Sequence, residues 1–328
     1  MNFQREKRIV RAYHAALDAK DWSAAAQHIA PECRWRGYHP FNEMVGPDAP
    51  MERFWQPLHD SIQHLQRRED AFFAGLNEMD GFTSTWVVSM GHLVGLFDAP
   101  WLGIPATGRM VFLRYATFLK ADGAQITDIA MFFDIPQVMV QAGLTPMPSQ
   151  LGAELVQPGP HPHDALLFEP QPEEAGKATL DAINAMIGDL GNWDLGLPLE
   201  EELRRTWHED MIWWGPTGIG ATYTIPRYAR QHSGPFRRVF SDRNFIGHIA
   251  RLAEGQYGGF FGWPNFTARL TEDYMGLPTA GQVGEFRVID IYRRAGDKLA
   301  ENWVFIDVPH FWLSQGVQIL PDEASALT

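Results

Sequence analysis

The sequence is short of cysteine and of basic residues. Cys33 is the single cysteine among 328 residues, so no disulfide can form within the chain, which fits a reducing compartment. Lys and Arg total 27 against 40 Asp and Glu, a net charge of −13, which argues against a nucleic-acid duplex or an anionic membrane surface as partner. The N-terminal segment lacks the apolar core of a signal peptide. No uncharged run reaches the ~18 apolar residues that span a bilayer. We therefore expect a cytoplasmic protein that does not contact membranes.

Signatures of nucleotide and metal chemistry are also missing. The sequence contains no Gly-rich phosphate loop with a lysine, no H-E-x-x-H and no G-x-S-x-G. Residues 255–259 are rich in glycine, but they lack a lysine and open no helix, so they indicate a hairpin or a bulge. The sequence predicts no cofactor and no bound metal.

The chain does contain an internal repeat. The triplet Gly103-Ile-Pro105 recurs as Gly276-Leu-Pro278, 173 residues later (276 − 103). Upstream, residues 33–37 resemble residues 211–215 at an offset of 178 (211 − 33). A sustained offset is the mark of duplication, so we expect two diverged copies of one domain. The pairs that keep the offset of 173 are Gly108 and Gly281, Arg114 and Arg287, Gly123 and Gly296, Asp134 and Asp307, Pro136 and Pro309, and Gly143 and Gly316.

The two copies are predicted to be joined by a proline-rich linker. Seven of the 23 prolines fall within residues 145–172. Proline cannot continue a helix or donate to a strand ladder, so this stretch favours a connector. The predicted boundaries are 1–144 for the first copy, 145–176 for the linker, 177–320 for the second copy and 321–328 for a tail. Tethering keeps the copies at high effective concentration, so we expect an intrachain pseudo-dimer, and a homo-oligomer stays open.

Each copy is predicted to begin with helices and to continue with antiparallel strands. Apolar residues recur at helical spacing near the N-terminus, Asp21 is placed to cap a short second helix, and a further helix is expected from about Pro50 to Ser61. Helices followed by a run of antiparallel strands indicate an α+β fold. The strands expected in the first copy are 33–38, 68–76, 82–97, 110–119 and 125–133, and those in the second are 211–214, 245–254, 256–270, 283–292 and 298–306.

The closing hairpins resemble those of the SnoaL-like polyketide cyclases, a family of the nuclear transport factor 2-like superfamily. The resemblance covers nearly all of both copies. It implies two tandem cone-shaped α+β domains, each a curved antiparallel sheet wrapped around N-terminal helices, with an aromatic-lined cavity. The segments that carry the resemblance are 54–58, 90–92, 102–109, Arg114, 121–126 and 133–134 in the first copy, and 275–281, Arg287, 296–299 and 301–307 in the second.

The resemblance implies a catalytic role for Asp134 and Asp307. Members of that family use a strand-end aspartate as acid and base in an intramolecular aldol closure. The apolar neighbours Phe132, Phe133 and Ile135 would disfavour a charged carboxylate at Asp134, as a general base near neutral pH requires. The alternative interpretation is a helix N-cap, because each aspartate stands just before a helix start that contains proline. Both interpretations stay open.

Three basic residues are candidates for work on the same substrate. Arg114 and Arg287 lie on the strand beside each aspartate, where they would stabilise an enolate if they point inward, or pair with a neighbouring acid if they do not. A shift of one residue in register decides the face. His92 is a candidate proton carrier or a buried core histidine. At its position the second copy offers Leu270.

Aromatic and polar residues are predicted to line a substrate pocket, with core packing as the alternative for each aromatic. Asp290 faces the strand that carries Asn302 in the second copy, where the first copy has Thr117 and Ile129, so at most one copy is chemically competent. The candidates are Tyr38, Trp86 and Trp101 in the first copy, and Trp213, Trp263, Asp290, Asn302 and Trp303 in the second.

The sequence therefore predicts a cofactor-independent acid/base enzyme, of polyketide cyclase or isomerase type, acting on a small apolar carbonyl compound. Two alternatives remain. One is a non-catalytic protein that binds a small apolar molecule. The other is a hydrolase in which an aspartate activates water.

Overall fold

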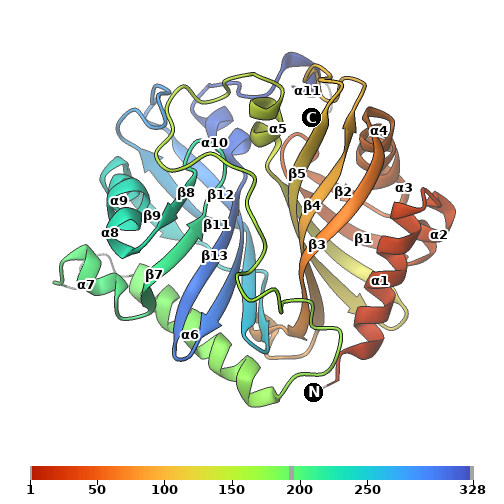
Figure 1. Ribbon diagram of the computed structural model, residues 1–328, viewed down its shortest axis with the longest axis horizontal. Coiled ribbons are helices and arrows are strands. Elements are labelled where there is room, and N and C mark those ends of the chain that lie inside the picture. The colour runs from red at the N-terminus through yellow and green to blue at the C-terminus, as the bar shows by residue number, and fades with distance from the viewer. Residues whose placement is uncertain (1, 192–195, 326–328) are drawn as a thin grey trace. The chain divides into compact units, whose positions relative to one another are not determined.

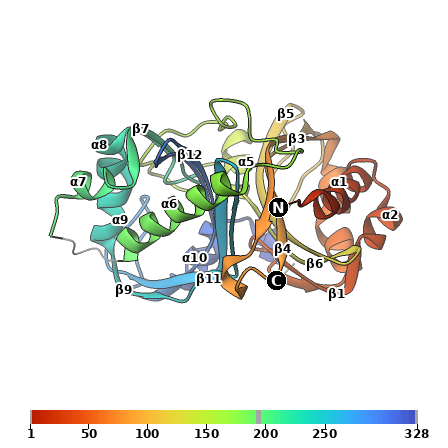
Figure 2. The ribbon, with the colours of Figure 1, turned by 90° about the horizontal axis from the view of Figure 1, so that it is seen from below.

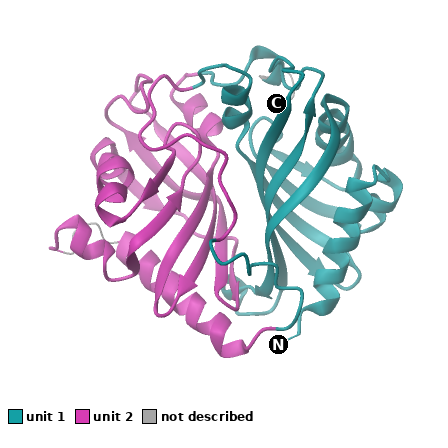
Figure 3. Ribbon diagram, viewed as in Figure 1, with its two compact units in different colours: residues 1–146, 161–170, 318–328 teal, residues 147–160, 171–317 magenta. Residues whose placement is uncertain are grey.

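The computed structural model describes residues 2–191 and 196–325. They divide into two compact units (Figure 3), one of residues 1–146, 161–170 and 318–328, the other of residues 147–160 and 171–317. The proline-rich segment is thus shared between the units, and the C-terminal segment goes with the first. Within the described ranges, no helix is both long and apolar enough to cross a bilayer.

The first unit opens with helices α1 (Gln4–Asp18) and α2 (Trp22–Gln27). Asp21 caps α2 as predicted, since its side chain accepts a hydrogen bond from the Ala24 amide at 2.9 Å. Helix α1 buries Val10, Tyr13 and Leu17 and packs across the strands of the first sheet (Figures 1 and 2).

The first sheet has six strands in the order β2-β1-β6-β5-β4-β3. Its neighbours are antiparallel except β1 and β6, which run parallel, so the predicted all-antiparallel sheet is wrong at this pair. The strands are β1 (Ile29–Gly37), β2 (Glu43–Val45), β3 (Ile62–Leu76), β4 (Thr85–Phe97), β5 (Met110–Asp122) and β6 (Gln125–Phe133). The other elements are α3 (Asp48–Pro50), the π-helical turn η1 (Met51–Trp55), α4 (Gln56–Ser61), η2 (Glu78–Asp80), α5 (Ile135–Gln141) and, near the C-terminus, α11 (Asp322–Ser325).

The second unit repeats this order around a seven-stranded sheet, β10-β11-β12-β13-β7-β8, with β9 also paired to β11. Here β7 and β13 are the parallel pair. The strands are β7 (Trp207–Trp214), β8 (Ala221–Tyr223), β9 (Phe240–Phe245), β10 (Ala250–Glu254), β11 (Tyr257–Leu270), β12 (Val283–Ala295) and β13 (Lys298–Ile306). The helices are α6 (Glu173–Gly191), α7 (Leu199–Leu203), α8 (Ile225–Tyr228), the π-helical turn η3 (Ala229–Ser233), α9 (Gly234–Val239) and α10 (Val308–Ser314).

The predicted duplication is confirmed by the closing elements of the two units. Strands β5 and β6 and helix α5 recur as β12, β13 and α10, with every boundary displaced by 173 residues. The tight turns that precede them also match, because Trp101 pairs with Ile104 as Tyr274 pairs with Leu277. Each turn holds two residues with positive φ, 55° and 75° in the first copy and 54° and 75° in the second. The second of these positions is Gly103 or Gly276, which accepts such a φ without a Cβ clash.

Of the earlier elements, β2 and α4 recur as β8 and α9 with both boundaries displaced by 178 residues, whereas the bounds of α1, β1, α2 and α3 are only approximately repeated. The single strand β3 is represented by two shorter strands, β9 and β10, which begin and end at the positions equivalent to its two ends. The π-helical turns η1 and η3 also coincide at this offset. The second sheet is therefore interrupted at an edge where the first is continuous.

Candidate functional site

The second unit encloses a cavity of about 320 Å³. Its walls come from the C-terminal turn of α6, from the helices around η3, and from strands β7, β9, β11, β12 and β13. The lining is mostly aromatic and aliphatic, as in small-molecule sites. The polar lining residues are Tyr228, His232, Ser233, Arg237, Arg243, His248, Asn265, Asp290, Tyr292 and Asn302.

A carboxylate and an amide form a pair in the cavity wall. Asp290 on β12 is 9% exposed, and it shares the cavity face with Val288 and Tyr292 because alternate residues of a strand face one side. The Nδ2 of Asn302, on β13, donates to Oδ1 of Asp290 at 3.3 Å and to the carbonyl of Ile291 at 3.1 Å. The backbone contact fixes which end of the amide faces the carboxylate.

Two buried tyrosines lie near this pair. Burial raises the pKa of Tyr228 above its usual value, and the charge of Asp290 raises it further. Burial raises the pKa of Tyr292 in the same way, again with a contribution from Asp290. Both phenols therefore keep their protons at neutral pH and are hydrogen-bond donors in the cavity wall.

Two histidines of the lining are held neutral. His232 stacks on Trp213 with ring centroids 3.9 Å apart, and His248 stacks on Phe260 at the same separation. Burial lowers the pKa of His232 to about 3. Burial, with the charge of Arg251, lowers the pKa of His248 to about 3. Within the described part of the chain, Nδ1 of His232 has no hydrogen-bond partner.

A bulge in β11 brings Asn265 into the cavity wall. Val288 of β12 faces Gly262 and Phe286 faces Phe266, so four steps on β11 oppose two on β12. The first copy has no such insertion, because His92 stands directly opposite Arg114. The two extra residues re-aim side chains, a common use of a bulge beside a site.

This register corrects the predicted counterpart of His92. Leu270 pairs with Phe240, just as Phe97 pairs with Ile62 in the first copy, so Leu270 corresponds to Phe97. The bulge occupies the position of His92. The prediction was wrong because it carried one offset across an insertion.

The two aspartates predicted as bases both cap helices. The carboxylate of Asp134 accepts a hydrogen bond from the Gln137 amide at 3.2 Å, and that of Asp307 accepts one from the His310 amide at 3.3 Å. Asp307 also lies 3.5 Å from Nη1 of Arg287. Both are buried, and neither is among the residues that line the cavity. These contacts support the N-cap interpretation.

The three basic candidates lie on the other face of their sheets. Arg287 alternates with the cavity residues of β12, and its guanidinium lies 4.0 Å from the ring centre of Trp263. Arg114 holds the equivalent place on β5. His92 faces Arg114 across the strands, and its Nδ1 lies 3.3 Å from Oδ2 of Asp70.

Of the predicted pocket residues, Trp213, Asp290 and Asn302 line the cavity. Trp303, on the opposite face of β13 from Asn302, donates Nε1 to the carbonyl of Pro158 at 3.1 Å, and Trp263 packs on Arg287. In the first unit, Trp86 donates to Ser84, Trp101 stacks on Phe41, and Tyr38 lies edge-on to Phe132. The cavity residues that the sequence did not indicate are Tyr228, His232, Arg243, His248, Asn265 and Tyr292. Of these, His232 could have been found from the offset of 178, which aligns it with Phe54.

The first copy differs at the cavity positions. Thr117, Ile129 and Phe54 stand where the second copy has Asp290, Asn302 and His232. Other polar residues occupy the equivalent face: Ser89, the cross-strand partner of Thr117, donates to Glu69 at 2.5 Å and lies 2.9 Å from the hydroxyl of Tyr115. The acid–amide pair therefore belongs to the second copy.

Residues 10–129 match the family model described as a SnoaL-like domain. Among solved structures, a candidate polyketide cyclase from Xanthomonas campestris pv. campestris is 22% identical, over 43% of this chain and 99% of its own, with a TM-score of 0.35. AclR, a candidate hydroxylase from Streptomyces galilaeus, is 16% identical over 42% and 96%, with a TM-score of 0.36. An NTF2-like protein from Burkholderia thailandensis is 21% identical over 42% and 95%, with a TM-score of 0.34. A search of curated proteins found no match.

Proposed function

We propose that the second copy of the repeated domain is a cofactor-independent acid/base catalyst, a proposal that the match of residues 10–129 to the SnoaL-like family model supports for the first copy and the repeated elements extend to the second. The proposed reaction is of isomerase or cyclase type, on a small apolar carbonyl compound bound in the cavity. The observation that carries the proposal is Asp290, a nearly buried carboxylate that lines an aromatic cavity and is held by Asn302.

The proposed chemistry begins with proton transfer to Asp290. Its carboxylate takes a proton from the carbon next to the substrate carbonyl, and the electron pair of that C–H bond moves onto the carbonyl oxygen. The phenol of Tyr228, which keeps its proton, donates a hydrogen bond to the enolate oxygen. In an unsaturated substrate Asp290 returns the proton to another carbon of the conjugated enolate, which isomerises the substrate. Alternatively, the enolate carbon attacks a second carbonyl, which closes a ring, and Asp290 returns the proton to the alkoxide that this attack forms.

Asp134 and Asp307 have a structural role in this proposal. Each carboxylate already accepts a hydrogen bond from a backbone amide in the first turn of the helix that follows it. Neither is among the lining residues, so neither is placed to reach a ligand in the cavity. The aspartate that the family resemblance implied as a base is thus replaced by one from the neighbouring strand.

Exchange of carbon-bound hydrogen tests the proposal without knowledge of the natural substrate. The purified chain is incubated in D₂O with 1-tetralone, a small apolar ketone, and loss of the α-proton signal is followed by NMR. Asp290→Asn should slow the exchange by about 100-fold or more while the ketone still binds. Asp297→Asn, an exposed hairpin position of the same unit, is the matched control and should behave as wild type.

Two outcomes would remove the proposal. If the wild-type chain binds the ketone without exchanging its protons, the cavity is a binding site and not a catalytic one. If Asp290→Asn exchanges as fast as wild type, another group is the base.

A further inference from the structure

We propose that His248 and Asn265 bind a hydroxyl group of the ligand, so that the cavity of the second unit selects carbonyl compounds whose ring carries a hydroxyl. The inference rests on the proposed function, since it names the substrate class of the same site. It is carried by two buried polar atoms of the cavity wall, by the bulge of β11 that places one of them, and by the ring packing that holds the other.

Asn265 offers a hydrogen-bond acceptor that the protein itself does not use. Its side chain is 8% exposed and belongs to the cavity lining, and its Oδ1 has no hydrogen-bond partner within residues 2–191 and 196–325. Buried polar atoms without a partner are costly and rare in folded proteins, so they suit a site where a ligand supplies the partner. Because an amide oxygen only accepts, that ligand has to supply a donor.

His248 lies beside Asn265 in the cavity wall. The amides of Ile246 and Gly247, which lead to His248, donate to the backbone carbonyl of Asn265 at 2.9 and 3.0 Å. The side chain of Asn265 is close enough to favour a proton on the His248 ring, yet Nδ1 of His248 is also without a hydrogen-bond partner in the described ranges. The two polar groups are therefore near each other but are not joined.

A hydroxyl group fits these two atoms because it both donates and accepts. The neutral ring of His248 carries one N–H donor and one acceptor nitrogen, and the neighbouring Oδ1 of Asn265 favours the N–H at Nδ1. A ligand hydroxyl then accepts from Nδ1 of His248 and donates to Oδ1 of Asn265. A ketone oxygen or a carboxylate only accepts, so neither can satisfy Asn265.

Both side chains are held by their packing. The ring of His248 stacks on Phe260 at 10° and meets the edge of Phe245, with ring centroids 5.4 Å apart. The bulge folds Asn265 over Gly262, where a Cβ would lie only 2.5 Å from Cα of Asn265. Glycine at this position therefore allows the close approach that directs Asn265 into the cavity wall.

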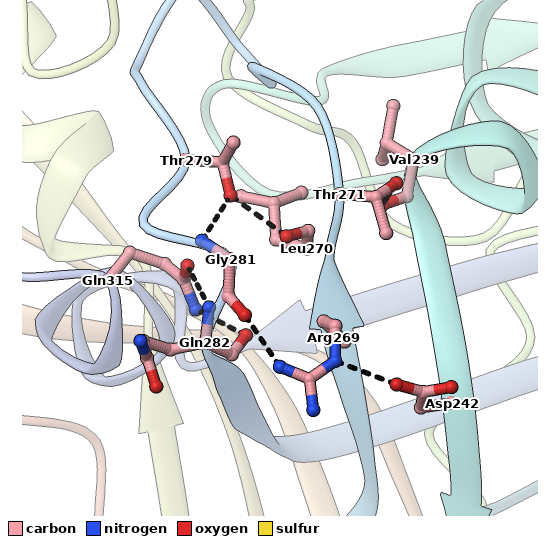
Figure 4. Close-up of polar contacts among 9 residues, drawn as sticks. All are labelled: Val239, Asp242, Arg269, Leu270, Thr271, Thr279, Gly281, Gln282 and Gln315. Carbon is pink, nitrogen blue, oxygen red and sulfur yellow. Dashed lines mark hydrogen bonds and ion pairs between the residues drawn. The ribbon is translucent and has the colours of Figure 1, made fainter.

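The strands that flank the bulge are also tied together outside the cavity. Asp242 on β9 accepts from Nε of Arg269 on β11 at 2.7 Å, and Nη1 of Arg269 donates to the carbonyl of Gly281 at 2.6 Å (Figure 4). Oγ1 of Thr271 donates to the carbonyl of Val239 at 2.8 Å. These bonds link the start of β9 to the end of β11. Polar atoms that are held in advance lose less freedom when a ligand binds.

Phe260 lies between the hydroxyl site and the proposed base. It pairs with Asp290 across β11 and β12, and its ring stacks on His248. A planar ring that packs on Phe260 has Asp290 on one side and His248 on the other. At about 30 Å³ for each water-sized group, the volume of about 320 Å³ suits roughly ten non-hydrogen atoms, the size of two fused six-membered rings.

Two naphthalenes of nearly equal size test the inference. One is 2-naphthol, and the other is 2-methylnaphthalene, which carries a methyl group in place of the hydroxyl. Dissociation constants are measured at pH 7 by calorimetry with the full chain. Wild type should bind 2-naphthol about tenfold or more tightly, because the methyl group leaves both polar atoms unpaired. Asn265→Leu should lower that preference by about tenfold and leave the affinity for 2-methylnaphthalene within about threefold of wild type.

A second variant keeps the ring packing and removes the polar atom. His248→Phe can still stack on Phe260, and it should lower the preference for 2-naphthol by about threefold or more. Asn244→Leu, at an exposed position of β9, is the matched control and should keep the wild-type preference.

Three results would overturn the inference. The first is equal affinity of wild type for both compounds, or no binding of either. The second is a full preference for 2-naphthol in both Asn265→Leu and His248→Phe. The third is a preference that only Asp290→Asn removes, because the hydroxyl would then bind the carboxylate instead.

The inference and the proposed function fail separately. If 2-naphthol is preferred through Asn265 and His248 but no proton exchange is seen with the ketone, the hydroxyl site stands and catalysis does not. If exchange depends on Asp290 but 2-naphthol is not preferred, catalysis stands and the hydroxyl site does not.

Discussion

Asn302 donates its side-chain amide to the carboxylate of Asp290 at 3.3 Å across two neighbouring strands, and both side chains line the same cavity. A second bond from the same Nδ2 to the carbonyl of Ile291 holds the amide in one orientation. A buried carboxylate needs such donors, because taking a charge out of water is costly unless it is hydrogen-bonded. In the first copy the two positions are Thr117 and Ile129, which cannot form this pair.

The first prediction concerns Asn302 as a positioning residue. Asn302→Leu removes the amide, so the carboxylate of Asp290 loses one donor and is free to turn away from the substrate. The maximal rate of proton exchange should fall by about tenfold, with little change in the ketone concentration that gives half the rate. Asn244→Leu, on the exposed part of β9, is the control. A rise in that half-rate concentration with an unchanged maximal rate would contradict the assignment.

The second prediction concerns the capping aspartates. Asp134→Ala should lower the free energy of unfolding by about 1 kcal/mol, whereas Asp134→Asn should stay near wild type, because asparagine is an equally good N-cap. Asp307→Asn should lower the free energy of unfolding even though the cap is kept, because it removes the charge 3.5 Å from Arg287. Urea denaturation measures these differences. Loss of proton exchange in Asp134→Asn without loss of stability would restore the catalytic interpretation of Asp134.

Much of the fold followed from patterns along the chain. Strands β6 (Gln125–Phe133) and β13 (Lys298–Ile306) have the bounds predicted for them, because Gly-containing turns mark their starts and a helix start with proline marks their ends. The offset of 173 located the repeat. The parallel pairing of β1 with β6 and of β7 with β13 was not predicted. The two strands of each pair are far apart in the sequence, so no local pattern indicates their relative direction.

The site was predicted only in part, for physical reasons. Asp290 and Asn302 were found because they differ from their first-copy counterparts. The face of Arg287 stayed open because the sides of a strand alternate at every residue, so a one-residue uncertainty in register reverses the answer. Asn265 depends on a bulge, and His232 depends on a π-helical turn that lays it on Trp213. Neither device has a sequence signature of its own.

The last prediction concerns acid stability. The pKa of His232 is lowered to about 3 by burial, against about 6.5 in an unfolded chain. Below pH 6.5 the unfolded chain therefore binds a proton at this histidine that the folded chain does not bind. The free energy of unfolding is highest above that pH and falls as the pH decreases toward 3. Between pH 7.5 and pH 5 this histidine should lower the free energy of unfolding by about 2 kcal/mol.

His232→Phe, which installs the residue that the first copy has at Phe54, should remove that loss, as measured by hydrogen exchange of the β12 and β13 amides at the two pH values. His310→Phe, at a partly exposed position of α10, is the control and should keep the wild-type loss. An unchanged loss in His232→Phe would mean that this ring is accessible to water and takes up its proton in the folded state.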